Sequence, residues 1–128
     1  MNRQVTVVKN DTGPDLTVVI VKNDDNQRFV TTPSNVHLNI RRKDTPTNIV
    51  TITADALKSI GTQAQYTFNL RTFTTHADVT PDFYEAEVEF IVPDGTDEQG
   101  NPQTATFTTF EQITIQVRDD YTLFLRHI

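Results

Sequence analysis

The 128-residue chain contains no cysteine and no tryptophan, and it has only four glycines. The absence of cysteine excludes disulfide bridges, thiolate metal sites and cysteine nucleophiles. Long hydrophobic runs are also absent, because no segment approaches the roughly 18 apolar residues needed to span a bilayer. Residues Met1–Gln4 lead straight into alternating residues without the pattern of a signal peptide. We therefore expect a soluble protein that has no membrane partner and is not secreted.

Positive charge is in short supply, since 11 Lys and Arg residues stand against 17 Asp and Glu residues, for a net charge of −6. Binding to nucleic acid requires a basic face that neutralises phosphates, so we expect no nucleic-acid partner. The one basic cluster, Arg41–Lys43, falls at a predicted strand end, and we interpret it as a solvated strand terminus. A chain of this length fits one domain.

The residues that are plentiful are those of β-sheets. Threonine is the commonest residue and valine, isoleucine and phenylalanine are abundant, whereas alanine and leucine are scarce. Runs of period 2 alternate with Pro, Asn, Asp and Gly clusters, which predicts an all-β fold, an antiparallel β-sandwich of about seven to eight strands. Strands are expected near Gln4–Lys9, Asp15–Lys22, Val36–Arg42, Ile49–Thr53, Ala64–Arg71, Phe83–Val92, Thr104–Phe110 and Gln112–Arg118.

The run Phe83–Val92 alternates most clearly, with apolar residues on one face and Glu85, Glu87 and Glu89 on the other. The glutamates are interpreted as a solvated face, with docking to a basic partner as the alternative. One short helix is predicted over Thr53–Gly61, because Thr53 or Asp55 can cap it, apolar residues recur three to four apart, and a glycine ends it.

No pattern of residues indicates catalysis or metal binding. The only serines, Ser34 and Ser59, lack a Gly-x-Ser-x-Gly motif, and the loop Pro93–Pro102 gathers carboxylates without the order of a calcium loop. The histidines lie far apart, without a second ligand at a recognised spacing; they are His37, His76 and His127. We predict a non-enzymatic protein with no catalytic residue, cofactor or metal.

An apolar cluster follows the last predicted strand and divides the chain into a sandwich over residues 1–118 and a C-terminal segment over residues 119–128. Its members are Tyr121, Leu123, Phe124, Leu125 and Ile128. The segment either adds a strand to its own sheet or forms an arm that becomes ordered on a neighbouring subunit. These five residues are the candidate partner interface.

Val-Lys-Asn-Asp occurs twice, at Val8–Asp11 and Val21–Asp24, as two strand ends that each run into a polar turn. With the residues that follow, "VKNDTGPDLTVVIVKNDDNQRFV…NVHLNIRR", this part of the chain resembles the immunoglobulin-like domain of baseplate upper proteins of tailed bacteriophages. Asp11–Pro14 matches that family's first turn, although Asn10 stands where glycine is common. Asn23–Asn26 falls at its second turn.

The resemblance continues through "PDFYEAEVEFIVPDG" and "ITIQV", and it spans roughly Val5 to Val117. Two departures concern Asp82, where the family usually has glycine, and Gln99–Gln103, which lengthens the last hairpin. The family's domain is often followed by further domains that reach a receptor-binding protein, and almost nothing follows the matched region here.

The resemblance implies an immunoglobulin-like sandwich and a structural component of a phage particle, assembled in the host cytoplasm and located in the virion. The first hypothesis is a tail or baseplate subunit that binds neighbouring virion proteins and forms a homo-oligomer in the particle. The first alternative is a capsid decoration (cement) protein. A receptor- or carbohydrate-binding module is the second, although a chain without tryptophan offers few aromatic platforms for sugars.

Overall fold

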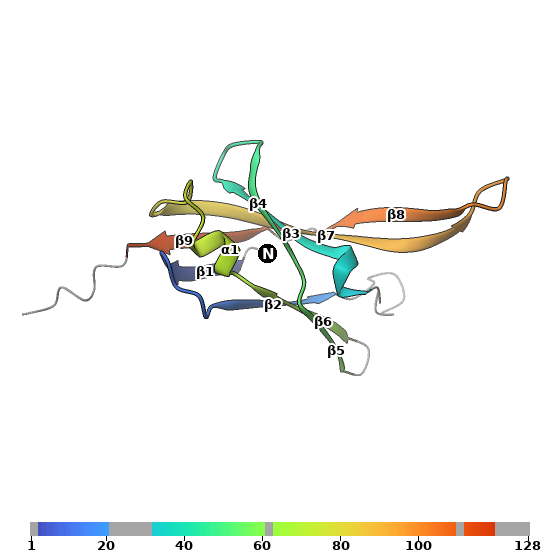
Figure 1. Cartoon of the computed structure of the whole chain (residues 1–128), viewed down its shortest axis with the longest axis horizontal. Helices are drawn as coiled ribbons and strands as arrows, with labels where there is room; N and C mark the ends of the chain where they lie inside the picture. Colours follow the sequence, from blue (N-terminus) through green and yellow to red (C-terminus); the bar gives the residue numbers. More distant parts are fainter. Residues whose placement is uncertain (1–2, 21–31, 61–62, 110–111, 120–128) are drawn as a thin grey trace, which may run out of the picture.

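The structure is a computed structural model, and it describes residues 3–20, 32–60, 63–109 and 112–119 (Figure 1). These residues form nine strands, one 3-10 turn and one short α-helix. The strands are β1 (Arg3–Val8), β2 (Asp15–Ile20), β3 (Val36–Arg42), β4 (Asn48–Thr53), β5 (Ala56–Ile60), β6 (Gln63–Asn69), β7 (Asp82–Thr96), β8 (Pro102–Thr108) and β9 (Ile113–Arg118). The turn η1 covers Pro33–Asn35 and the helix α1 covers Arg71–Thr74.

The larger sheet has the strand order β1-β9-β7-β3-β4 and is curled into a half-barrel, with β8 paired to β7 beyond the end of β9. The pair β1–β9 is parallel, from Arg3 opposite Ile113 to Val8 opposite Arg118, and the other pairs are antiparallel. The sheet is therefore mixed, and the prediction of a purely antiparallel sandwich is wrong at this pair. Local alternation predicts a strand but not its direction relative to a distant partner.

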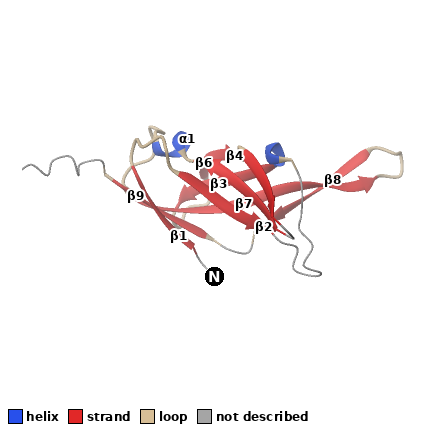
Figure 2. Ribbon diagram, turned by 90° about the horizontal axis from the view of Figure 1, so that it is seen from below, coloured by secondary structure: helices blue, strands red, loops and turns tan. Residues whose placement is uncertain are grey.

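The smaller sheet has the order β2-β6-β5 and is antiparallel throughout (Figure 1). Most of the described chain is strand, with two short helical segments (Figure 2). The inward residues Leu16, Tyr66 and Phe68 of the smaller sheet join one core with the inward residues of β3, β7 and β9. The alternation predicted for Phe83–Val92 is confirmed, since Tyr84, Ala86, Val88 and Phe90 are all buried. Burial on one face of each strand thus holds the two sheets together.

The predicted helix over Thr53–Gly61 is wrong, because Ala56–Ile60 forms strand β5. This strand pairs with β6 from Ala56 opposite Thr67 to Ile60 opposite Gln63. A helix of one or two turns has little stability of its own, so a cross-strand ladder overrides weak helix propensity. The observed helix instead follows β6, at Arg71–Thr74, where the sequence predicts the end of a strand. Each of the eight predicted strands lies on an observed strand.

The turn after β1 is anchored on helix α1. Asn10 adopts φ 74°, in the left-handed region that glycine and asparagine tolerate best. Its N–H donates to the carbonyl of Thr74 (2.9 Å), and the buried Thr74 hydroxyl donates to the carbonyl of Asp11. The backbone geometry explains why asparagine can stand at a position where glycine is the usual choice.

The hydroxyl of Tyr84 fixes the connection that leads into β7. It donates to the Thr80 carbonyl (2.8 Å) and accepts from the Thr80 N–H (2.9 Å), while the ring packs edge-on against Phe73 with centroids 5.1 Å apart. Tyr84 is fully buried, so both bonds are shielded from water. One side chain therefore positions both the turn before β7 and the helix α1.

We predict that Tyr84→Phe destabilises the fold by about 1–3 kcal/mol, because it leaves the Thr80 N–H and C=O without this partner while keeping the ring in place. Urea unfolding followed by circular dichroism measures the change. Phe73→Leu, which removes the edge-on ring contact but neither hydrogen bond, serves as the comparison. Unchanged stability of Tyr84→Phe would show that water replaces the two bonds without cost.

Candidate interaction surfaces

The outward face of the larger sheet carries an ion-pair cluster across β3 and β7. Arg41 lies opposite Glu85 in the ladder, and its Nη2 donates to Glu85 Oε2 (3.1 Å) and to Glu87 Oε1 (3.5 Å). The Arg41 side chain is 19% exposed and that of Glu85 13%. Glu85 Oε2 also accepts from Gln112 Nε2 on the other side of β7 (3.4 Å). This arrangement largely satisfies the two carboxylates within the sheet.

The third glutamate of β7 also lies near a side chain of β3. His37 Nδ1 lies 3.9 Å from Glu89 Oε1, again between β3 and β7. The interpretation of Arg41–Lys43 as solvated is therefore wrong for Arg41, and the glutamate face of β7 does not face solvent alone. Sequence patterns revealed both clusters, but only the adjacency of β3 and β7 pairs them.

We predict that Arg41→Gln destabilises the protein by about 1–2 kcal/mol, because it leaves two half-buried carboxylates near each other without a cation. Adding Glu85→Gln should recover part of the loss. A double-mutant cycle from urea unfolding at low and high salt measures the coupling. Strictly additive effects of the two changes would contradict the pairing.

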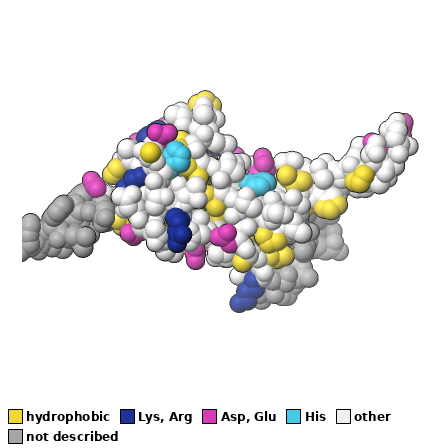
Figure 3. Space-filling model, in the orientation of Figure 1, with side chains coloured by type: hydrophobic (Ala, Val, Ile, Leu, Met, Phe, Trp, Pro, Cys, Tyr) yellow, Lys and Arg dark blue, Asp and Glu magenta, His cyan; other side chains and the backbone are white. Residues whose placement is uncertain are grey.

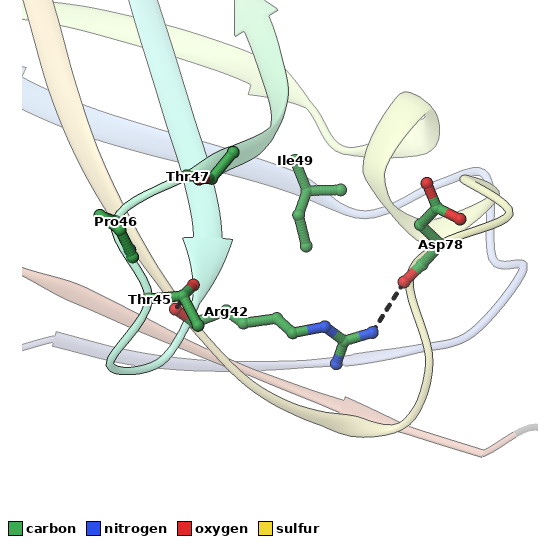
Figure 4. Close-up of a pocket in the computed structure, with 6 residues that line it drawn as sticks. All are labelled: Arg42, Thr45, Pro46, Thr47, Ile49 and Asp78. Carbon is green, nitrogen blue, oxygen red and sulfur yellow. Dashed lines mark hydrogen bonds between the residues drawn. The ribbon is translucent and has the colours of Figure 1, made fainter.

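Arg42, whose side chain lies on the opposite face of β3 from that of Arg41, contacts the turn before β7. Its guanidinium donates to the Asp78 carbonyl (2.9 Å) and to Asp82 Oδ2 (3.3 Å), and it lies 5.3 Å from the centroid of the Tyr84 ring. An open pocket lies beside it (Figure 4). The pocket is lined by Arg42, Thr45, Pro46, Thr47, Ile49 and Asp78. Because the Arg42 donors are already engaged by the protein, the pocket does not present a free cation to a ligand.

His76 and Ser34 have hydrogen-bond partners close to them in the chain. His76 Nδ1 accepts from the Asp78 N–H (3.1 Å), and the hydroxyl of Ser34 lies 3.0 Å from that of Thr32. Ser59 lies in β5, and His127 is outside the described residues. Across the described ranges, His, Asp and Glu form no group of three that could hold a metal. Neither helical segment in those ranges has the length or hydropathy of a membrane span.

The β7–β8 arm, defined here as residues 91–106, projects beyond the sheet as a two-stranded ribbon (Figure 1). The ladder of β3 along β7 ends at Phe90, opposite Val36, and the arm continues past this point. The arm's apolar face runs on from the core through Val92 and Ala105, and at its base Phe107 stacks on Phe90 with centroids 5.8 Å apart. Phe107 is 41% exposed, and Figure 3 shows hydrophobic side chains along the arm.

The arm belongs to a strongly acidic part of the chain. Residues 72–117 contain nine Asp and Glu residues and no Lys or Arg. Glu85, Glu87 and Asp82 in the sheet have the arginine partners described above, whereas Asp97 and Glu98 lie at the exposed tip of the arm. An apolar ribbon with an acidic tip is the most prominent candidate contact surface in the described part of the chain. Lengthening of this hairpin at Gln99–Gln103 was the one signal for it in the sequence.

Asp97 organises the tip of the arm. Its Oδ1 accepts from the N–H groups of Asn101 (2.8 Å) and Gln99 (2.9 Å), and its Oδ2 accepts from Asn101 Nδ2 (3.3 Å). Gly95 and Gly100 adopt φ 72° and 82°, which only glycine accepts readily. The loop is thus the hairpin connection that the sequence predicts, and its carboxylate serves as a turn former.

The hydrogen bonds to Asp97, the one from the Asn101 backbone first, lower the pKa of this carboxyl below its ordinary value. A lowered pKa in the folded state stabilises the turn above the ordinary pKa and loses that contribution as the pH falls through the lowered value. We predict by NMR that Asp97 titrates at lower pH than in Asn101→Ala, which removes one of the bonds. Equal titration midpoints in the two proteins would contradict this assignment.

The predicted interface residues Tyr121, Leu123, Phe124, Leu125 and Ile128 lie outside the described residues, as does the second Val-Lys-Asn-Asp segment. No family model, curated protein or solved structure matches the chain.

Proposed function

We propose that the chain is a non-enzymatic structural component of a tailed-phage particle, a tail or baseplate subunit that binds neighbouring virion proteins. The proposal rests on the resemblance of residues Val5 to Val117 to the baseplate upper protein family and on the position of the arm. Its place would be in the virion, assembled in the host cytoplasm, with other virion proteins and further copies of itself as partners.

An immunoglobulin-like assignment of the fold supports this proposal. The order β9-β7-β3-β4 corresponds to strands G, F, C and C′ of a variable-type domain, and β2-β6-β5 corresponds to B, E and D. Tyr84, near the start of the strand equivalent to F, bonds to the backbone four residues upstream, as the tyrosine of immunoglobulin-like domains does. The left-handed Asn10 also fits the turn at which the family commonly has glycine.

The observation that carries the proposal is the position of the arm. In the immunoglobulin-like assignment the arm is the connection between strands F and G, at the end of the sandwich where variable domains bind their partners. Here that connection is a projecting ribbon with an apolar face and an acidic tip. Such a ribbon suits contact between subunits of an assembly, because a two-stranded ribbon is only marginally stable alone and gains from being covered.

We predict that mass spectrometry of purified particles of the phage that encodes this chain detects it. The copy number decides between the two structural hypotheses, since abundance matching the capsid lattice indicates a decoration protein and a small number indicates the tail. Absence from particles would contradict both. Replacing Pro93–Thr104 by Asn-Gly, which keeps Val92 opposite Ala105, should prevent incorporation while leaving the melting temperature nearly unchanged. Shortening the β3–β4 loop, Lys43–Thr47, is the matched control, and it should leave incorporation intact.

A further inference from the structure

Strand β8 is an edge strand that carries no charged residue, although the chain has a net charge of −6. Residues Gln99–Phe110 contain no charged residue, and β8 reads Pro-Gln-Thr-Ala-Thr-Phe-Thr. Among the described strands only β7 pairs with it. Proteins usually protect exposed edges with charges, bulges or an inward-pointing lysine, because an open edge recruits other strands. The register shift of this ladder, between Pro93 and Thr96, and Pro102 both lie toward the tip of the arm, and no such device interrupts the run from Glu89 opposite Thr108 to Pro93 opposite Thr104.

The hydrogen-bonding groups of this edge can be assigned from the ladder. The N–H of Thr109 donates to the Val88 carbonyl (3.0 Å), and bonded pairs alternate along an antiparallel ladder. Ala105 and Phe107 therefore direct their N–H and C=O toward β7. Thr104, Thr106 and Thr108 direct theirs to the open side, where a further strand can bind.

We propose that β8 of a second copy binds this edge antiparallel, so that the arms of two copies form one four-stranded sheet. A two-fold axis at Thr106 places Thr106 opposite its own copy and Thr104 opposite Thr108. The same register places the small Ala105 opposite the large Phe107 of the other copy. Two exposed apolar faces then merge into one, and three or more strands with an apolar face are far more stable than a ribbon.

The absence of charge on β8 favours a second copy of the chain as the partner that binds this edge. In an isologous antiparallel pair each side chain near the axis meets itself or a close neighbour, so any charge there would oppose a like charge. Strand β8 carries none, although the surrounding chain is acidic. The two acidic tips point in opposite directions in this arrangement, which keeps their carboxylates apart.

Strand β4 is a comparable edge, since it is also uncharged and lies at the end of its sheet. The register shift in its ladder with β3 leaves a regular run of only Val50–Thr53, whereas the regular run of β8 covers Thr104–Thr108. The shorter run makes β4 the less suitable edge for strand addition. Thr53 on β4 is exposed like Thr106, so it provides a matched control position.

Sedimentation of the purified full chain over a range of concentrations tests the pairing. We expect a monomer–dimer equilibrium that Thr106→Lys and Thr106→Glu each weaken by about tenfold or more, because like charges then lie directly opposite each other. An equimolar mixture of the two variants should dimerise again, whereas Thr53→Lys should behave as wild type. A wild-type chain that stays monomeric, a dimer insensitive to Thr106→Lys, or loss of the dimer on Thr53→Lys would each overturn the proposal.

Cysteine cross-linking tests the two-fold axis independently, because the natural chain has no cysteine. A bonded antiparallel pair has Cα atoms about 5.5 Å apart, too far for an unstrained disulfide between the Cβ atoms but within reach of a short bifunctional thiol reagent. With such a reagent Thr106→Cys should form a covalent dimer readily and Thr53→Cys should not. Failure of Thr106→Cys to cross-link would overturn the register. The proposal does not depend on a role in a phage particle, so absence from particles and absence of a dimer are separate results.

Discussion

The alternation of residues along β7 is the constraint on which most of this structure depends. Burial of Tyr84, Ala86, Val88 and Phe90 on one face forces Glu85, Glu87 and Glu89 onto the other. Three carboxylates on one strand face require a compensating charge nearby, and β3 supplies it through Arg41, which contacts Glu85 and Glu87. The apolar face and the charged face of β7 therefore favour the same neighbour in the same register. A slip of one residue would bury the glutamates and expose the core side chains.

The sequence predicts well those features that depend on local alternation. All eight expected strands exist, and the most regular one, Phe83–Val92, forms the centre of the larger sheet. Prediction from the sequence fails where the pairing of a strand with another part of the chain decides the secondary structure. Ala56–Ile60 has weak helical periodicity, yet its ladder with β6 makes it a strand, and Asp55 accepts the Asn69 N–H (3.0 Å) rather than capping a helix. The parallel contact of β1 with β9 joins strands about a hundred residues apart in the chain, and no local pattern encodes it.

The candidate surfaces likewise combine features that local sequence patterns predict with features that only strand pairing determines. The basic cluster at Arg41 and the acidic strand at Glu85 are each visible in the sequence, but their pairing depends on the contact of β3 with β7. In the sequence, only the extra length of the hairpin at Gln99–Gln103 indicates the arm. Its projection follows from β7 being 15 residues long while its neighbour β3 has seven. Because β7 extends beyond the end of β3, β7 and β8 continue past the sheet as a two-stranded ribbon.

The distribution of charge links the arm to assembly. A chain with net charge −6 repels its own copies at long range. Close association is then favoured only where an apolar, uncharged surface offsets that repulsion. Within the described residues the arm combines an apolar face, an uncharged edge and distance from the ion pairs of the sheet. Because the carboxylates of the tip lie beyond β8 itself, repulsion acts at the end of the arm while the pairing edge remains neutral. The long hairpin thus separates the charged parts of the molecule from the uncharged edge that we propose to pair with a second copy.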